Sequence, residues 1–385
     1  MDFDPLHINL PIREVIPDIR EHLTASNTLI VHAPPGAGKS TLLPLALYTE
    51  NWLGGKKVIM LEPRRLAARA IATRMASLLQ EEVGRQVGYR IRFENKTGKN
   101  TLIEVVTEGI LTRMIHTDNS LEGVGLVIFD EFHERSIHAD VALALCREAQ
   151  QILRPDLRIL IMSATLDMPL LAQLLRCPTV ESEGKQYPVE IIYQGMQDIK
   201  LLPELTASAV RKAVAEKDGD ILAFLPGEGE IKKCEELLRK QLTGISIHPL
   251  YGQLPHSQQQ LAIMPHRDGK RKIVLATSIA ETSLTIEGIK IVVDSGYARV
   301  ARFDPKSGLS RLETVLISKD SADQRAGRAG RLSAGTCYRL WSKATHAQLA
   351  DHRRPEILEA DLASLVLELA HWGVYNLNEL TWIRL

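Results

Sequence analysis

A glycine-rich loop lies near the start of the chain, between an apolar run and a helix-like stretch. The run Thr28–His32 is followed by Ala33-Pro34-Pro35-Gly36-Ala37-Gly38-Lys39-Ser40-Thr41, and the sequence then becomes apolar. Glycines let a phosphate approach the backbone closely, and the first N–H groups of a helix attract its charge. Lys39 can reach the β- and γ-phosphates, and the Ser40 hydroxyl can ligate Mg²⁺. The loop therefore predicts a nucleoside-triphosphate site. Its candidate residues are Gly36, Ala37, Gly38, Lys39, Ser40 and Thr41.

Two adjacent acids end another apolar run. Gly125–Phe129 leads directly into Asp130-Glu131-Phe132-His133. Carboxylates at the end of a buried strand are costly unless they meet a cation or water. Adjacent acids alone more often mark a solvated loop, but a phosphate loop in the same sheet favours Mg²⁺. We expect Asp130 to hold the metal, mainly through water, and Glu131 to polarise the attacking water. The candidate metal-binding residues are Ser40, Asp130 and Glu131.

Three arginines recur at intervals of three residues late in the chain. The octet reads Gln324-Arg325-Ala326-Gly327-Arg328-Ala329-Gly330-Arg331. This spacing predicts that the arginines share one helical face. Like charges on one face are unfavourable unless an anion binds them, and a γ-phosphate in a cleft between two halves would supply that anion. A solvated basic face is the alternative interpretation, and the interleaved small residues and Gln324 argue against it.

Short apolar runs alternate with helix-like stretches, which is typical of parallel α/β sheets. The runs of the first half are Thr28–His32, Lys57–Leu61, Leu102–Val106, Gly125–Phe129 and Arg158–Met162. The runs of the second half are Asp220–Leu225, Ile245–Leu250, Lys272–Ala276, Ile289–Val293, Thr314–Ile317 and Thr336–Leu340. Two α/β halves with a joint near Glu183–Ile199 are therefore expected. Chemistry in such sheets lies at the carboxyl ends of the strands, where the phosphate loop and the acids stand.

The composition excludes several classes of protein. Of 385 residues, 45% are hydrophobic and 24% are charged, an ordinary globular balance. No apolar run reaches the roughly 18 residues of a membrane span, and Met1–Glu14 does not resemble a secretory signal. The four cysteines form no CxxC pair, so we expect neither zinc nor disulfides and a cytoplasmic setting. The 47 basic and 47 acidic residues cancel, which still permits a local basic groove for nucleic acid.

The sequence resembles the DEAH/RHA-type helicases of superfamily 2, most closely their bacterial HrpB-like branch. The motifs occur in that family's order along nearly the whole chain. They are Gly36–Thr41, Glu62-Pro63-Arg64-Arg65, Gly88–Glu94, Thr107-Glu108-Gly109, Asp130-Glu131-Phe132-His133, Ser163-Ala164-Thr165, Phe224-Leu225-Pro226-Gly227, Ala276–Ile286 and Gln324–Arg331. The fold implied is α/β, with two tandem RecA-like domains of parallel sheets flanked by helices. Their expected bounds are residues 1–185 and 186–350, followed by the start of a helical winged-helix domain at 351–385.

The resemblance implies roles for residues around the nucleotide. Glu131 and Gln324 would position the hydrolytic water, and Arg328 and Arg331 would touch the γ-phosphate. His133 would couple the two domains. Arg74 would pack on the base, Ser283 would sense the nucleotide state, and Thr285 and Glu287 would lie near the ribose. Glu287 stands where the family usually has Asp, Phe132 replaces the alanine of the DEAH box, and Ile263 replaces an aromatic residue that packs on the base.

The resemblance also implies contacts with a nucleic-acid backbone. The matching residues are Arg65, Thr107, Thr165, Thr277 and Thr282. The segment Tyr297–Ile317 lies where the family has a strand-separating hairpin. Beyond Pro355, a stretch with helical spacing is expected to be partly exposed or folded back on the second half.

These features predict an RNA helicase or translocase that uses ATP or another nucleoside triphosphate with Mg²⁺. We expect a monomer that contacts single-stranded RNA through its backbone and does not bind membranes. A DNA translocase and a nucleotide-dependent RNA clamp that does not unwind remain open alternatives. The RNA target, the direction of movement and any protein partners are not given by the sequence.

Overall fold

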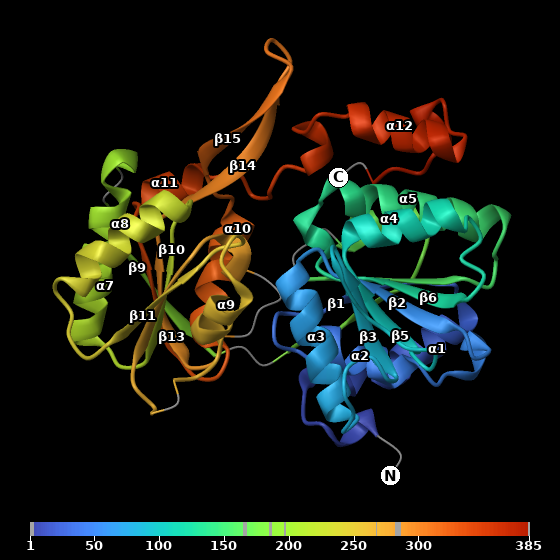
Figure 1. Ribbon diagram of the computed structural model, residues 1–385, viewed down its shortest axis with the longest axis horizontal. Coiled ribbons are helices and arrows are strands. Elements are labelled where there is room, and N and C mark those ends of the chain that lie inside the picture. The colour runs from blue at the N-terminus through green and yellow to red at the C-terminus, as the bar shows by residue number, and fades with distance from the viewer. Residues whose placement is uncertain are drawn as a thin grey trace. The chain divides into compact units, whose positions relative to one another are not determined.

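The computed structural model describes residues 4–164, 168–184, 187–195, 198–266, 268–281 and 286–383. The chain forms two compact units (Figure 1). Unit 1 comprises Met1–Gly184 together with Pro355–Leu385, and unit 2 comprises Lys185–Arg354. Within the described ranges, no helix combines the length and apolar character needed to cross a membrane.

Unit 1 is built on one sheet with the strand order β4-β3-β5-β2-β6-β7-β1-β8. The strands are β1 (Thr28–His32), β2 (Lys57–Leu61), β3 (Val87–Ile91), β4 (Glu94–Lys96), β5 (Ile103–Val106), β6 (Val124–Phe129), β7 (Arg158–Ser163) and β8 (Thr179–Glu181). Neighbouring strands are parallel except for the edge pair β3 and β4. The central strands are apolar and buried on both faces, as a parallel sheet covered by helices requires.

The register brings the carboxyl ends of the central strands of unit 1 to one edge. His32 at the end of β1 pairs with Ser163 of β7, and Phe129 at the end of β6 pairs with Leu61 of β2. The segments that follow these strands therefore begin side by side. They include the phosphate loop after β1 and the acidic pair after β6.

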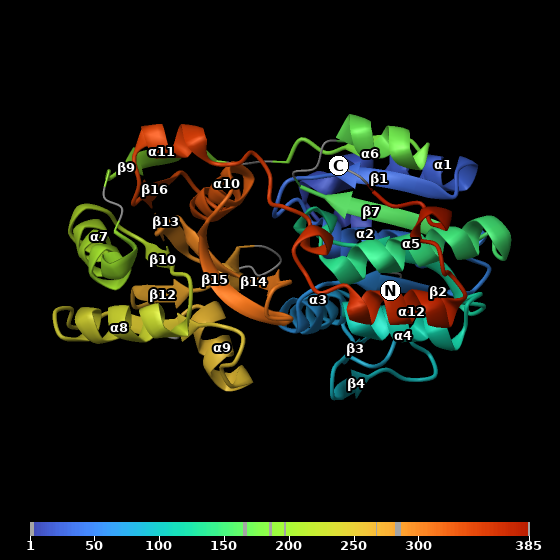
Figure 2. The same ribbon diagram turned by 90° about the horizontal axis from the view of Figure 1, so that it is seen from above.

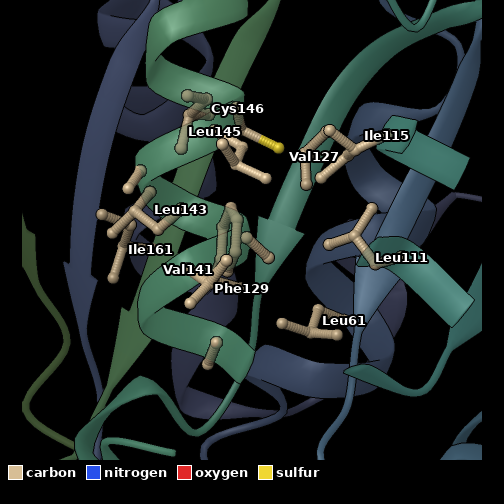
Figure 3. Close-up of a cluster of buried hydrophobic side chains, with 14 of the residues drawn as sticks. Leu61, Leu111, Ile115, Val127, Phe129, Val141, Leu143, Leu145, Cys146 and Ile161 are labelled. Atoms are coloured by element: carbon tan, nitrogen blue, oxygen red, sulfur yellow. The ribbon is translucent and has the colours of Figure 1, made fainter. Parts of the chain in front are cut away.

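Helices cover both faces of the unit 1 sheet (Figures 1 and 2). They are α1 (Ile16–Ala25), α2 (Lys39–Leu47), α3 (Arg65–Leu78), α4 (Glu108–Thr117), α5 (Ile137–Ile152) and α6 (Met168–Leu175). A further helix, α12 (Ala363–Trp372), packs against α4 and α5. The core beneath α4 and α5 joins Phe129 and Ile161 of the sheet to Leu111 and Val141 of the helices (Figure 3). This packing fixes where the strand ends, and hence the loops that follow them, are held.

The carboxyl-terminal segment packs on unit 1. Leu365 and Leu369 of α12 are buried in the same core as α4 and α5, and the Trp372 indole donates a 2.7 Å hydrogen bond to Glu148 of α5. Of the two alternatives expected for this segment, folding back on the second half is wrong and partial exposure is confirmed. The apolar stripe of α12 has its complement in unit 1, while Leu367 on its other side is 72% exposed.

Unit 2 contains a fully parallel sheet with the order β11-β12-β10-β13-β16-β9. Its strands are β9 (Val189–Tyr193), β10 (Asp220–Phe224), β11 (Ser246–Leu250), β12 (Lys272–Ala276), β13 (Ile289–Asp294) and β16 (Gly335–Arg339). Its helices are α7 (Leu202–Glu216), α8 (Glu228–Arg239), α9 (His256–Ile263), α10 (Lys319–Gly327) and α11 (Lys343–Gln348).

A two-stranded antiparallel hairpin projects from unit 2 (Figure 1). It is formed by β14 (Tyr297–Asp304) and β15 (Leu309–Leu316), and a turn around Asp304 joins them. The hairpin expected at Tyr297–Ile317 is thus present. The expectation that Thr314–Ile317 forms part of the parallel set is wrong, because this run pairs with β14 alone.

Candidate nucleotide site

The phosphate loop is held in a conformation that its glycines permit. Gly36 and Gly38 have φ of +87° and +95°, in the left-handed region. A Cβ atom on Gly38 would lie 2.8 Å from Cδ1 of Leu10, so Leu10 would have to shift to admit a side chain there. Ile12 also donates a 2.9 Å backbone hydrogen bond to the Ala37 carbonyl. The segment that contains Leu10 and Ile12 therefore supports the loop. The helix α2 begins at Lys39 without a side-chain cap, as helices that bind anions at their amino end do.

Glu131 lies between two groups that also come from the sequence predictions. Its Oε1 atom is 3.3 Å from Nζ of Lys39, and its Oε2 atom is 3.3 Å from Nε2 of His133. All three side chains are at most 6% exposed. The structure thus brings together the phosphate-loop lysine and two residues of the acidic motif. Burial strengthens their electrostatic interactions because water screens them little.

Asp130 has one oxygen bound and one oxygen without a partner among the described residues. Its Oδ1 accepts a 2.9 Å hydrogen bond from the Glu131 N–H, while the buried Oδ2 accepts none. Burial, and next the charge of Glu131, raise the pKa of Asp130 to about 7, and Lys39 and Ser40 oppose this rise. A bound divalent cation would offset both effects. An unpaired carboxylate oxygen near a hydroxyl is the donor set that Mg²⁺ prefers, so Asp130 and Ser40 fit this metal.

A third buried carboxylate, Glu62, belongs to the same region and was given no role by the sequence analysis. Glu62 follows β2, is fully buried and accepts a 3.2 Å hydrogen bond from the Arg64 N–H. Burial, and then the charges of Asp130, Glu131 and Glu134, raise its pKa well above the ordinary value. The motif Glu62-Pro63-Arg64-Arg65 was the available signal, but only the register shows that β2 and β6 end side by side.

Phe132 of the acidic motif packs in the core of unit 1. It is 1% exposed and its ring meets that of Phe129 edge-on at 6.1 Å. This change from the usual alanine therefore fills the core rather than the site.

The other candidates in unit 1 follow neighbouring strands. Arg65 is exposed at the start of α3, after β2, and Thr107 precedes α4, after β5. Arg65 and Thr107 therefore lie at the carboxyl edge of the unit 1 sheet, where the acidic pair also lies. Arg74 is exposed farther along α3. Thr165 lies outside the described residues. The contacts of these residues with base or backbone stay predictions.

In unit 2 the three arginines differ in their burial and in their partners. Arg325 is 1% exposed, and it forms ion pairs with Glu281 at 3.0 Å and with Asp294 at 2.9 Å. The helix α10 ends at Gly327, and Arg328 begins a single 3-10 turn, Arg328–Gly330. Two carboxylates therefore neutralise Arg325 within unit 2.

The remaining candidates in unit 2 have varied surroundings. Arg328 is buried and its Nε donates a 2.9 Å hydrogen bond to the Glu281 carbonyl, whereas Gln324 and Arg331 are partly exposed. Thr277 follows β12 and is anchored through a 3.2 Å backbone hydrogen bond to the Leu250 carbonyl. Glu287 is exposed. Candidates Thr282, Ser283 and Thr285 lie outside the described residues, and a site between the two units stays a prediction.

Two parallel-sheet units, one with a phosphate loop and an acidic strand end, define a class of nucleotide-dependent motors. Residues 13–173 match the DEAD/DEAH box helicase family, and residues 199–333 match the helicase conserved C-terminal domain family. The chain belongs to the DEAD/DEAH box helicases, and its two units are RecA-like.

Particular relatives place the chain within that family. It is 49% identical over 377 residues to the ATP-dependent RNA helicase HrpB of Escherichia coli, across 97% of this chain and 46% of that protein. It is 38% identical to the ATP-dependent RNA helicase HrpA of Borreliella burgdorferi, across 97% of this chain and 46% of that protein. A crystal structure of the E. coli DEAH/RHA helicase HrpB superposes with a TM-score of 0.92, at 49% identity, over 97% of this chain and 48% of that one. The chain spans about half the length of these relatives.

Proposed function

We propose that this chain hydrolyses Mg²⁺-bound ATP or other nucleoside triphosphates and couples hydrolysis to movement along RNA. The observation that carries the proposal is the buried arrangement of Lys39, Glu131 and His133 beside Asp130, at the edge where the phosphate loop begins. The relatives HrpB and HrpA, named ATP-dependent RNA helicases, support the choice of nucleotide and of RNA.

The residues of unit 1 divide the chemistry among them. Lys39 neutralises the β- and γ-phosphates, and Ser40 and Asp130 hold Mg²⁺, which when bound draws charge from the phosphate oxygens. Glu131 orients and deprotonates the attacking water, and the neighbouring Lys39 and His133 hold its carboxylate in place. Nucleotide entry takes Lys39 from Glu131 to the phosphates.

We assign further steps of the reaction to residues of unit 2. Gln324 orients the water together with Glu131, and Arg328 and Arg331 neutralise charge on the γ-phosphate. Arginine contacts of this kind contribute about 10³–10⁵ to the rate. Arg328→Ala and Arg331→Ala should therefore be nearly inactive in a hydrolysis assay, while Arg239→Ala, which breaks an exposed pair with Glu235, should not differ from wild type. Normal turnover of the two variants would remove unit 2 from the reaction.

We further propose that the protein is a cytoplasmic monomer and that it binds single-stranded RNA by contacting the RNA backbone. Arg65, Thr107 and Thr277 follow strands at the carboxyl edges of their sheets and have the donors that phosphates need. The four cysteines are free, which agrees with a reducing compartment.

The deciding experiment compares nucleoside-triphosphate hydrolysis with single-stranded RNA, single-stranded DNA, duplexes and no nucleic acid. Stimulation by RNA supports the proposal, and stronger stimulation by DNA would assign a DNA translocase. RNA-stimulated hydrolysis without duplex unwinding or translocation would assign a clamp. In the same assay Glu131→Gln should bind nucleotide and fail to turn over, because the amide cannot accept a proton. Full activity of Glu131→Gln would contradict the proposed chemistry.

A further inference from the structure

Arg325 contacts groups from four separate segments of unit 2. Its Nε pairs with Glu281, which follows β12, and its Nη1 pairs with Asp294 at the end of β13. The same Nη1 donates a 3.2 Å hydrogen bond to the Tyr297 carbonyl, and the guanidinium lies 4.8 Å from the ring centre of Phe224. A planar guanidinium with five donors can satisfy partners in several directions at once.

Glu281 extends this network to the candidate γ-phosphate arginine. Its carboxylate accepts from the Ser321 hydroxyl and from Arg325, both on α10. Its backbone carbonyl accepts the 2.9 Å hydrogen bond from Nε of Arg328. The position of the Arg328 side chain is therefore tied, through one residue, to the position of Arg325.

Tyr297 extends the network in the other direction, because it is the first residue of the β14–β15 hairpin. The root of the hairpin is closed by a 3.1 Å hydrogen bond from the Ile317 N–H to the Gly296 carbonyl. Farther along β14, Arg299 pairs with Glu230 of α8 at 2.9 Å and fills the space over Gly227. Contacts at the root of the hairpin thus hold it to the rest of unit 2, and the hydrogen bond from Arg325 to the Tyr297 carbonyl is one of them.

We propose that Arg325 is a positioning residue that holds Arg328 and the root of the β14–β15 hairpin in one fixed arrangement. The inference rests on the proposed function, in which Arg328 meets the γ-phosphate. A shift of Arg328 on nucleotide binding or hydrolysis moves Glu281 and Arg325, and through the Tyr297 carbonyl it moves the hairpin. Asp294 and Glu281 are nearly buried and need a cation with this geometry, since a buried carboxylate without its partner is strongly unfavourable.

Arg325→Lys tests the inference, because it retains the charge and removes the fork that reaches three acceptors. We expect kcat for hydrolysis to fall by about 10- to 10²-fold, as a misplaced charge near a reacting group does. The KM for nucleotide should change less than about twofold, since Arg325 does not touch it. Stimulation by single-stranded RNA should fall further than the basal rate, because the link to the hairpin is also cut.

Two more variants separate positioning from stability. Arg271→Lys is the matched control, because Arg271 lies just before the amino end of β12, away from Arg328. At that position it donates hydrogen bonds to the Gly219 and Val214 carbonyls. Glu281→Gln weakens the pairing with Arg325 and keeps the backbone carbonyl that binds Arg328. It should therefore disturb folding less than Arg325→Lys does. It should repeat the loss of kcat and of RNA stimulation at a melting temperature close to that of Arg271→Lys.

The outcomes distinguish this inference from the proposed function. A wild-type chain that hydrolyses no nucleotide overturns the proposed function and the inference with it. An active wild type, an inactive Arg328→Ala and fully stimulated Glu281→Gln and Arg325→Lys would overturn the inference alone. Loss of activity in Glu281→Gln in proportion to its melting temperature, with the ratio of RNA-stimulated to basal rate unchanged, would reduce Arg325 to a purely structural residue.

Discussion

Glu131 shows at the residue scale how the backbone and the site depend on each other. Its φ of +49° is unusual for a residue with a side chain, and such strain commonly costs about 1–3 kcal/mol. The left-handed turn lets Glu131 leave the strand at Phe129 and reach both Lys39 and His133. Among the described residues, the neighbouring Asp130 keeps one carboxylate oxygen without a hydrogen-bond partner.

Lys39→Ala should weaken nucleotide binding, because it removes a positive charge from the phosphates and a partner from Glu131. Titration with a fluorescent nucleotide analogue would measure the change in Kd. Lys56→Ala is a suitable control, since Lys56 pairs with Asp156 in an exposed ion pair of the same unit. Equal affinity of Lys39→Ala and Lys56→Ala would remove Lys39 from the site.

At the scale of elements, the junction between α4 and α5 carries a buried acid. Glu108 is the first residue of α4 and accepts a hydrogen bond from Ser136, the N-cap of α5. Burial raises its pKa to about 7, against the opposing hydrogen bond from Ser136, and Glu134 and Glu356 add to the rise. The carboxyl group of Glu108 at this junction therefore keeps its proton up to about pH 7.

Glu108→Gln should stabilise the protein in a pH-dependent way. Below about pH 4.5 the wild-type carboxyl is protonated in both states, so it makes no difference to folding. Between pH 4.5 and about 7 the unfolded chain loses the proton and the folded chain keeps it, so wild-type stability falls as pH rises. Above about 7 the variant should be more stable by on the order of 3 kcal/mol.

Urea unfolding of wild type and Glu108→Gln across this pH range would measure the difference. Glu21→Gln provides the baseline, because Glu21 is exposed on α1. A difference between wild type and Glu108→Gln that does not grow with pH would contradict the assignment.

The segment before the phosphate loop places apolar side chains against the loop. The 3-10 helix Pro11–Val15 packs Ile12 beneath the loop, and the preceding Leu10 faces Gly38 with an apolar side chain. Neither side chain offers a hydrogen bond that reads a base, and an arginine such as Arg74 stacks on any base. GTP, CTP and UTP should therefore be hydrolysed at rates comparable to ATP. Steady-state rates with the four nucleotides test this, and a strong preference for ATP would contradict it.

At the scale of the whole molecule, the chain crosses from unit 1 to unit 2 and returns. The returning segment is fastened near the acidic motif as well as in the core. Arg135 donates a 2.8 Å hydrogen bond to the Ile383 carbonyl, and the Glu356 N–H donates to the Arg135 carbonyl at 3.0 Å. The carboxyl-terminal segment is therefore a structural part of unit 1.

Leu369→Ala should lower the free energy of unfolding by about 2–5 kcal/mol, the usual cost of emptying a leucine site in a core. Leu369 is 1% exposed, whereas Leu367 on the same helix is 72% exposed. Leu367→Ala should therefore change stability by less than about 0.5 kcal/mol. Urea unfolding of both variants measures the effect, and equal stabilities would show that α12 does not hold unit 1 together.

The sequence by itself determined the two α/β units and the residues at their strand ends. Long apolar runs such as Lys57–Leu61 and Lys272–Ala276 are the strands of a buried parallel sheet because only such strands are apolar on both faces. Lys39 and Glu131 were expected near each other because carboxyl ends of parallel strands share an edge. The strand β9 escaped detection, since this half-exposed edge strand lacks an apolar run.

Only the tertiary structure decided which charged groups pair with one another. Helical spacing placed Arg325 with Arg328, but Asp294 and Glu281 come from positions 31 and 44 residues away and bind it. Spacing also predicted an apolar helix near the end of the chain without saying which unit would bury it. Local patterns record which residues share a face, whereas the partner of that face comes from chain segments that only folding brings together.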